Sequence, residues 1–137
     1  MKKAITLFTI CAFAFTGMMV EAKNKLTVES ANPVVIKTFP QAGAIDVDPN
    51  IKEIKVTFSK DMMTNQMWSW AMASKESFPK IIGEVKYLND KRTCIAPVSL
   101  EPNKTYAIWF NSKKYGNFKD TNKRSAIPYL LVFKTGK

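Results

Sequence analysis

Histidine is absent from this chain of 137 residues, while cysteine occurs twice and glycine only five times. A chain without histidine lacks a principal zinc ligand and the usual base that activates a serine or cysteine nucleophile. The few glycines form no glycine-rich phosphate loop. These absences predict a protein with no metal site and no cofactor.

Acidic residues are also scarce, with 11 aspartates and glutamates against 21 lysines and arginines and a formal net charge of +10. Hydrolysis of a glycoside needs two carboxyl groups placed together across a cleft. The acids of this chain are scattered over predicted turns and outward strand faces, so no such pair is expected. The sequence therefore predicts a protein that is not an enzyme and has no catalytic residues.

Long apolar runs are missing except near the N-terminus, where residues 1–22 have the pattern of a secretory signal peptide. Two lysines open it, residues 4–15 are mostly apolar, and Val20-Glu21-Ala22 is a cleavage site with small residues at its first and third positions. The apolar run is too short for an ordinary membrane span. We therefore expect an exported protein, located in the periplasm, at the cell surface or outside the cell. Its processed form would begin at Lys23 and have no transmembrane segment.

A lipoprotein signal is the alternative, because Cys11 lies within the apolar run. Bulky Ile10 precedes it where a small residue is wanted, and the apolar residues continue beyond it, so lipidation is disfavoured. Cleavage after residue 22 would leave Cys94 without a cysteine partner in the chain, and no internal disulfide could form. Because Cys94 lies in an apolar, strand-like run, we expect it to be a buried structural residue.

Short alternating runs follow, separated by turns rich in glycine, proline, asparagine and aspartate. Strands are predicted at residues 33–38, 53–59, 68–72, 84–88, 93–96, 105–111 and 129–135. After a loose N-terminal lead over residues 23–32, this spacing predicts one all-β domain over residues 33–137. The expected fold is an Ig-like β-sandwich of about seven antiparallel strands, with an open barrel as the alternative.

The period of two within these strands predicts which side chains are buried. The predicted core comprises Ile54, Val56, Phe58, Tyr106, Ile108, Phe110, Leu131 and Phe133, and the predicted outward side chains include Lys55, Thr57 and Lys134. A tyrosine corner is also expected, in which the hydroxyl of Tyr106 bonds to an acceptor on the backbone near Leu100 to Pro102. A buried phenol needs such a partner.

Several stretches of the chain, in the order given below, resemble the SbsA-type bacterial Ig-like domain family. Residues 40–50 read Pro-Gln-Ala-Gly-Ala-Ile-Asp-Val-Asp-Pro-Asn, and residues 54–62 read Ile-Lys-Val-Thr-Phe-Ser-Lys-Asp-Met. Later come Leu100-x-Pro102-x-x-x-Tyr106 and a final Phe133-Lys134-Thr135-Gly136. The resemblance covers about residues 33–136. It implies an Ig-like sandwich of exported and surface-layer proteins, used as a spacer or binding module, and it supplies no catalytic residues.

Aromatic and basic residues late in the chain supply the candidate ligand-binding site. Trp109, Tyr115 and Phe118 are predicted to form an exposed platform for a sugar or a peptide, with Lys113 and Lys114 beside it. For Trp109 a place in the core is an equally weighted alternative. The chain departs from the general family pattern in two other places, the Trp68-Ser69-Trp70 pair and the Asn117-x-x-Asp120-x-Asn122 loop, in which Lys123 stands where a turn glycine is frequent. Neither departure identifies a partner.

Two further aromatic residues, Trp68 and Trp70, share one face of a predicted strand. We expect them in the core, because Ig-like sandwiches favour a buried tryptophan on the third strand and large aromatics dominate cores. An exposed position for them would instead favour ligand binding.

The late basic residues are Lys104, Lys113, Lys114, Lys119, Lys123 and Arg124. Such a cluster either meets polyanions, for example teichoic acid or lipopolysaccharide, or forms a solvated face that keeps an exported domain soluble. Export argues against nucleic acid as a partner.

Asp46-x-Asp48-x-Asn50 imitates the start of a calcium loop, but it lacks the sixth-position glycine and the twelfth-position glutamate. An Asx-type turn is the preferred interpretation of these residues.

Taken together, these patterns predict an exported, non-catalytic Ig-like module that binds or scaffolds at the bacterial cell envelope. Its expected partner is an envelope glycan, a polyanion or a protein. A secreted accessory or inhibitor protein acting on an enzyme or glycan is the alternative.

Overall fold

A computed structural model describes residues 25–137. The predicted signal peptide and its cleavage site before Lys23 lie outside the described residues. The lead after it is exposed over residues 25–30 but anchored near its end. Lys60 Nζ donates to the carbonyl oxygens of Glu29 (2.8 Å) and Ala31 (2.7 Å), and the Asn32 side chain donates to the carbonyl of Ser125 (3.0 Å). These bonds attach the end of the lead to the domain.

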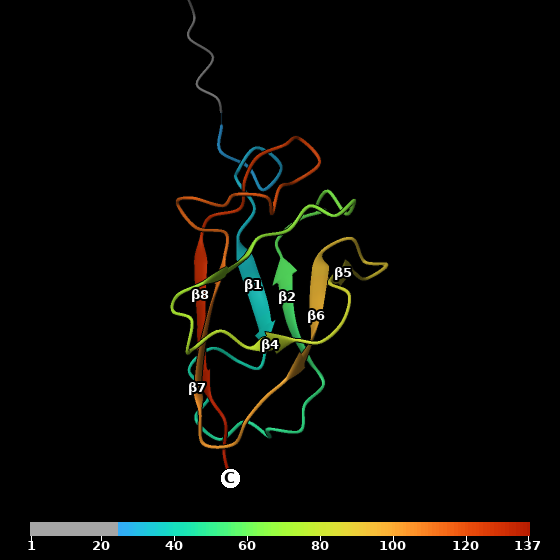
Figure 1. The fold of residues 1–137 in the computed structure, drawn as a ribbon. Helices are drawn as coiled ribbons and strands as arrows, with labels where there is room; N and C mark the ends of the chain where they lie inside the picture. The colour runs from blue at the N-terminus through green and yellow to red at the C-terminus, as the bar shows by residue number, and fades with distance from the viewer. Residues whose placement is uncertain (1–24) are drawn as a thin grey trace, which may run out of the picture.

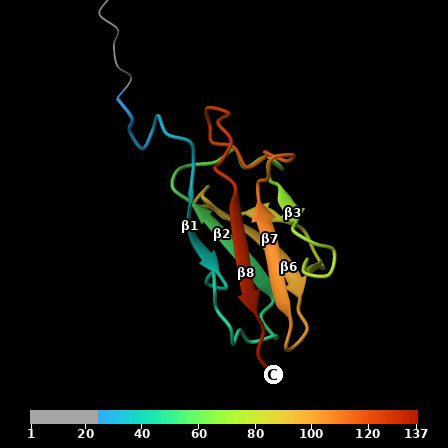
Figure 2. The same cartoon turned by 90° about the vertical axis from the view of Figure 1, so that its left-hand side faces the viewer.

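Eight strands make up the described chain, and it contains no α-helix. They are β1 (Val35–Phe39), β2 (Glu53–Phe58), β3 (Trp70–Met72), β4 (Lys80–Ile81), β5 (Lys86–Tyr87), β6 (Thr93–Ser99), β7 (Thr105–Phe110) and β8 (Tyr129–Lys134). Antiparallel pairing gives one sheet in the order β1-β2-β6-β4, in which β5 also pairs with β6, and a second sheet in the order β3-β7-β8. Figures 1 and 2 show the two sheets packed face to face, which is the predicted β-sandwich.

The core between the sheets has the predicted register. All eight residues predicted to form it are buried, each with at most 1% exposure. Lys134 is exposed, and Lys55 and Thr57 are partly exposed on the other face of β2. In β2, β7 and β8 the alternation follows from the pleat, because successive side chains of a strand point to opposite faces and one of these faces packs against the other sheet. In β6 the residues from Thr93 to Ala96 are buried on both faces.

Strand β6 runs through Pro97, which corrects the expectation that it would end at Ala96. A proline is tolerated there because its lateral neighbour changes at this point: β5 pairs opposite Cys94 and Ile95, whereas β4 pairs from Val98 onward. The Pro97 carbonyl still accepts the N–H of Ile82 (2.9 Å). The two-residue β4, which the sequence analysis did not predict, is held by this edge of β6.

The segment after β1 crosses to the other sheet and runs beside β8. Gly43 N–H donates to the carbonyl of Val132 (2.7 Å), and Lys134 N–H donates to Ala44 (2.8 Å). Further along, Val47 and Thr135 form a parallel bridge. One edge of the β3-β7-β8 sheet is thereby covered by residues 43–47. The Asx-type turn follows, with the Asp48 carboxylate accepting the N–H of Asn50 (2.8 Å).

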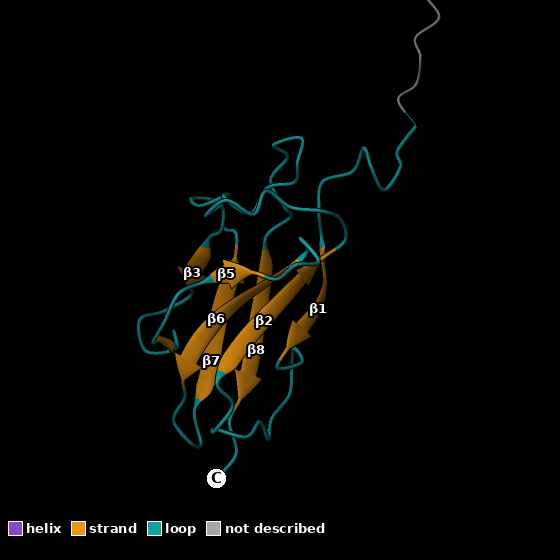
Figure 3. Cartoon of the chain, turned by 90° about the vertical axis from the view of Figure 1, so that its right-hand side faces the viewer, coloured by secondary structure: helices purple, strands orange, loops and turns teal. Residues whose placement is uncertain are grey.

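Tyr106 forms the predicted corner, with a difference in its hydrogen bond. The buried phenol oxygen accepts the backbone N–H of Glu101 at 2.7 Å, instead of donating to a carbonyl. Thr135 supports the same turn, because its hydroxyl accepts the N–H of Lys104 (2.9 Å) and donates to the carbonyl of Glu101. Two buried side chains thus fix the turn between β6 and β7. Figure 3 shows the path of the backbone through this turn.

Residues 112–128, predicted to be a long polar loop, fold back onto the core. Phe118 is fully buried and packs 4.8 Å, between ring centroids, from Phe58. Asn111 is buried where β7 ends: its side-chain amide donates to the carbonyls of Phe118 and Ala126 (3.0 Å each), and its side-chain oxygen accepts the N–H of Phe118 (2.9 Å). One buried asparagine thus fixes the path of the loop.

Candidate functional site

The edge of β3 is a feature of this fold that is open to a partner. β3 pairs with β7 alone, whereas the opposite edge of the same sheet is covered by residues 43–47. Ser69 accepts the N–H of Asn111 (3.1 Å), which shows that its backbone groups face β7. Backbone groups alternate along a strand, so those of Ala71 face β7 as well, and those of Trp70 and Met72 face away from it. Among the described residues, none donates to or accepts from them on that side.

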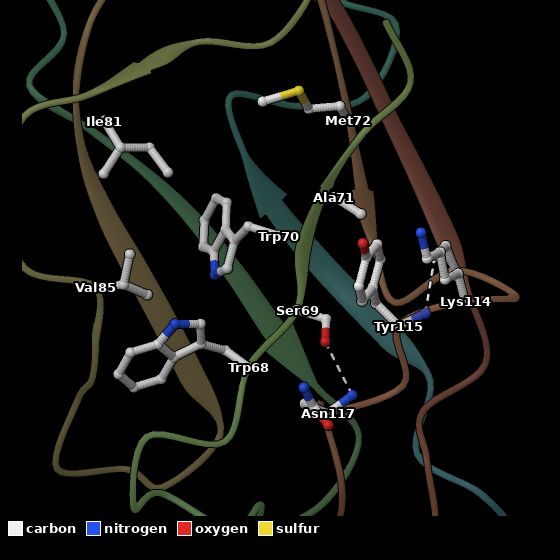
Figure 4. A pocket seen from close by; sticks show the side chains of 11 residues that line it. Trp68, Ser69, Trp70, Ala71, Met72, Ile81, Val85, Lys114, Tyr115 and Asn117 are labelled. Carbon is white, nitrogen blue, oxygen red and sulfur yellow. Dashed lines mark hydrogen bonds between the residues drawn. The ribbon is translucent and has the colours of Figure 1, made fainter. Parts of the chain in front are cut away.

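A hollow of about 700 Å³ lies along this edge (Figure 4). We call it the edge hollow. Its lining comes from three parts of the chain: the β3 segment, the edge of the other sheet, and the loop after β7. The lining residues are Trp68, Ser69, Trp70, Ala71, Met72, Ile81, Val85, Ser112, Lys114, Tyr115 and Asn117. In Figure 4, Trp68, Trp70, Ile81 and Val85 lie on one side of the β3 backbone and Tyr115 and Lys114 on the other.

Trp70 forms the floor of the hollow and also packs against the core. Its indole ring meets Phe110 edge to face at a centroid distance of 4.8 Å. Its ring N–H is buried and has no hydrogen-bond partner among the described residues. Beyond the ring lies Cys94, where burial raises the pKa of the thiol to about 12 despite the opposing effect of the Trp70 indole. Cys94 is therefore buried, as the sequence predicted, and its thiol is held in the protonated form.

Trp68 forms one wall and is held by Tyr87 of β5. The two rings lie 6.4 Å apart, and the Tyr87 hydroxyl donates to the carbonyl of Met67 (2.8 Å). Burial, with a smaller contribution from Cys94, raises the pKa of Tyr87, which keeps its hydroxyl a neutral donor. As predicted, Trp68 and Trp70 both pack against the core, and each also presents part of its surface to the hollow.

The loop after β7 forms the wall on the other side of β3, and it is held to the β3 segment. Asn117 donates its backbone N–H to the Ser69 hydroxyl (3.0 Å), as Figure 4 shows. Lys114 lies with its ammonium 5.3 Å from the centre of the Tyr115 ring. Lys114 is the one charged residue in the lining, so the hollow combines an apolar floor with a single cation at its rim.

The predicted platform of Trp109, Tyr115 and Phe118 is not assembled as a unit. The prediction that Phe118 is exposed is wrong, because its ring fills the core between Phe58 and Phe110. Trp109 is partly exposed on the outer face of β7 and does not line the edge hollow. Tyr115, 49% exposed, does line it.

Of the two predicted lysines, Lys114 lies at the hollow and Lys113 does not. Among the other late basic residues, Lys104 lies at the opposite end of β7, where it pairs with Glu101 (2.8 Å). No single basic patch forms from the six. The residues that sequence reasoning missed are Met72, Ile81 and Val85. Met72, 61% exposed at a strand edge, is an apolar residue that alternation alone could have placed next to Trp70.

No cluster of three or more potential metal-ligating side chains occurs among residues 25–137. Within the same range there is also no helix long and apolar enough to span a membrane. The arrangement described above offers shape, apolar surface and free backbone groups, which are the properties of a binding surface.

Two antiparallel sheets joined in this order, with a tyrosine corner at their connection, define an Ig-like sandwich. A family model described as bacterial Ig-like domain matches residues 29–135, and the chain belongs to that family.

Solved structures of bacterial surface-layer proteins are similar in fold. The surface layer protein SbsC, domains 1–6, shares 20% identity over 80% of this chain with a TM-score of 0.50, and the N-terminal part of the bacterial S-layer protein SbsC gives the same three values. This chain spans 14% and 24% of the lengths of those two chains. At this level of identity the similarity shows the fold alone. A search of curated proteins found no match.

Proposed function

We propose that this protein is an exported, non-catalytic Ig-like module that binds a partner at the bacterial cell envelope through the edge hollow. The observation that carries the proposal is the conjunction of a free strand edge with an apolar hollow of about 700 Å³ at the same place. Apolar pockets with a few placed polar groups are the usual sites of recognition. Within the described chain the outer edge of β1 is also unpaired, but the hollow of about 510 Å³ beside it has no tryptophan in its lining.

Export is supported by the signal-peptide pattern of residues 1–22, and processing would leave the domain over residues 33–137 behind a short lead. Membership of the bacterial Ig-like family and the fold similarity to surface-layer proteins support a place at the cell envelope. Within that family we assign the chain to the SbsA type, on the motifs at residues 40–50 and 54–62. The scarcity of acids and the lack of histidine support a binding role over catalysis.

To test export, the full chain is expressed with a C-terminal tag in a bacterial host. The molecular mass of the tagged product is then measured by mass spectrometry in each cell fraction. The expected product is found outside the cytoplasm and has the mass of a chain that starts at Lys23. An uncleaved product in the cytoplasm, or one lipidated at Cys11, would contradict the export part of the proposal.

Binding at the hollow is tested by cross-linking the purified protein to intact envelopes and comparing three proteins: the parent, Trp68→Ala and Trp109→Ala. Trp68 lines the hollow, whereas Trp109 is a tryptophan of the same chain outside it. The expected result is that Trp68→Ala loses most of the cross-linked product and Trp109→Ala keeps it. Equal loss in both variants, or none in either, would contradict a site at the hollow.

A further inference from the structure

We propose that the edge hollow binds an extended, acidic peptide segment of a partner protein, which adds a strand to the free edge of β3. This inference rests on the proposed function and specifies the class of partner and the mode of binding. Four observations support it. They are the free backbone groups of β3, the different residues on the two sides of the hollow, the positive charge around it, and the like charges that oppose binding of a second copy.

The backbone supplies the main recognition element. Trp70 and Met72 each present one N–H and one C=O group away from β7, as the pairing of Ser69 with Asn111 requires. An extended peptide can satisfy all four groups at once, whereas a sugar or a compact ligand cannot match their spacing along a strand. β3 is only three residues long, so the contact is short and the affinity expected from it is moderate.

The two sides of the hollow determine the side-chain pattern of the peptide. Residues of an added strand point alternately to the two faces of the sheet. One set would enter the apolar space between Trp70, Ile81 and Val85. The other set would lie on the face of β3 that Tyr115 and Lys114 cover (Figure 4). The matching peptide therefore alternates apolar residues with residues that suit a lysine.

Charge identifies those alternating residues as acidic. Lys114 is the one charged group in the lining of the edge hollow. A neighbouring hollow, which shares Trp68 and Val85 with it, adds Lys86 and Lys91 against one acid, Glu84. The whole chain carries a net charge of +10. Complementary charge steers association and selects the partner.

A second copy of this chain is the other occupant that could pair with β3. Antiparallel pairing of two β3 edges about a twofold axis would bring the same surface of each copy together. The contact would then bring together two chains that each carry Lys114 at the hollow and a net charge of +10. Like charges placed together oppose such a contact. The charge of the chain thus favours an acidic partner over self-association.

The test uses the purified full chain and synthetic hexapeptides, with binding measured by isothermal titration calorimetry. The first peptide alternates valine and glutamate, the second alternates valine and lysine, and the third has the composition of the first in a sequence without alternation. We expect the glutamate peptide to bind at least about tenfold more tightly than the other two, a difference equivalent to about 1.4 kcal/mol. In Lys114→Glu, the preference should shift towards the lysine peptide.

The backbone is tested from both sides of the contact. Met72→Pro removes one outward N–H without touching the ladder to β7, and Met72→Ala is its control because it keeps that N–H. We expect Met72→Pro to weaken binding of the glutamate peptide about tenfold and Met72→Ala to weaken it less. Should Met72→Pro not fold, peptides N-methylated at alternate residues serve instead: one set of positions should abolish binding and the other set should leave it intact.

Three results would overturn the inference. The first is that the three peptides bind equally, or that none of them binds. The second is that N-methylation has the same effect at both sets of positions. The third is a dimer, seen in sedimentation, that Met72→Pro dissociates. The proposed function fails separately, when Trp68→Ala leaves capture by envelopes unchanged. If cross-linking to envelopes depends on Trp68 but not on the Met72 N–H, the hollow is a binding site but the partner does not add a strand to β3.

Discussion

The backbone N–H of Glu101 donates a 2.7 Å hydrogen bond to the phenol oxygen of Tyr106, five residues further along the chain. The bond ties the turn after β6 to the first buried side chain of β7. It therefore determines how the chain passes from one sheet to the other.

Tyr106→Phe should lower the free energy of unfolding by about 1–2 kcal/mol, because the Glu101 N–H would lose its acceptor while the ring packing remains. Urea denaturation of the two proteins measures the difference. Tyr115→Phe is the control, since that hydroxyl lies on a ring that is half exposed. Equal stability of Tyr106→Phe and the parent would show that the corner does not stabilise the fold.

Asn111 gives a second stability prediction, because it combines a φ of +58° with three buried hydrogen bonds. Asn111→Ala should cost at least about 3 kcal/mol through lost hydrogen bonds and an unfavourable backbone conformation. Asn111→Gly loses the same bonds but tolerates positive φ, so it should be about 1 kcal/mol more stable than the alanine variant.

Thermal and urea unfolding measure the stability of the two Asn111 variants. Asn117→Ala is the control, because the Asn117 side chain lies on the same loop and is exposed. If the glycine and alanine variants are equally stable, the positive φ is not the source of the difference. If both match the parent, the asparagine does not hold the loop.

Asp120 gives a prediction about pH. Burial raises the pKa of its carboxyl, but hydrogen bonds from the Arg124 amide, the Lys60 ammonium and the Asn122 amide outweigh burial and hold it below its ordinary value. A carboxyl with a lowered folded pKa stabilises the protein above its unfolded pKa of about 4 and loses that contribution as the pH falls through the folded value. Stability should therefore decline as the pH falls below about 4.

Asp120→Asn should be less stable than the parent at pH 7 and should lose less stability between pH 5 and pH 3. Urea midpoints across this range measure both effects. Asp61→Asn is the matched control, because the Asp61–Arg92 pair (2.8 Å) is half exposed and such surface pairs contribute little. A parent and an Asp120→Asn variant with parallel pH profiles would contradict the role given to this carboxyl.

Cys94 should be unreactive towards thiol reagents in the folded protein. Its side chain is fully buried and burial raises its pKa to about 12, so at pH 8 almost none of it is thiolate. A protein that begins at Lys23, and so lacks Cys11, should react with a chromogenic disulfide only at its rate of unfolding, and completely within the mixing time in concentrated urea. Rapid labelling of the folded protein would show that the thiol is accessible.

The local alternation of apolar and polar residues was sufficient to predict the strands that have one buried face. β2 and β7 alternate without interruption, and the sheet register follows from that alternation. Pro97 misled the prediction of β6, since a proline usually ends a ladder, and only the change of neighbour from β5 to β4 makes it acceptable. β4 was missed because two residues carry no period of their own.

The candidate site was harder to predict, because its parts come together only through the tertiary fold. Tyr115 and Lys114 were selected from composition and do lie at the hollow. Phe118 was misplaced because a polar loop gives no sign of folding inward. The bonds from Asn111 that draw the loop inward join residues seven and fifteen positions apart, and no short sequence pattern signals them.

The parallel contact between residues 43–47 and β8 has a mechanical consequence. The chain enters the domain at one end of the sandwich and β8 leaves it at the other (Figure 2). Tension applied between the two ends would pull the 43–47 segment and β8 in opposite directions along their common axis. The hydrogen bonds from Gly43, Val47, Lys134 and Gly136 would then be loaded in shear and would share the force, whereas a strand pulled from one end of a hairpin breaks its bonds one at a time. The contact that closes this edge of the sheet thus also makes the domain a stiff link along its long axis.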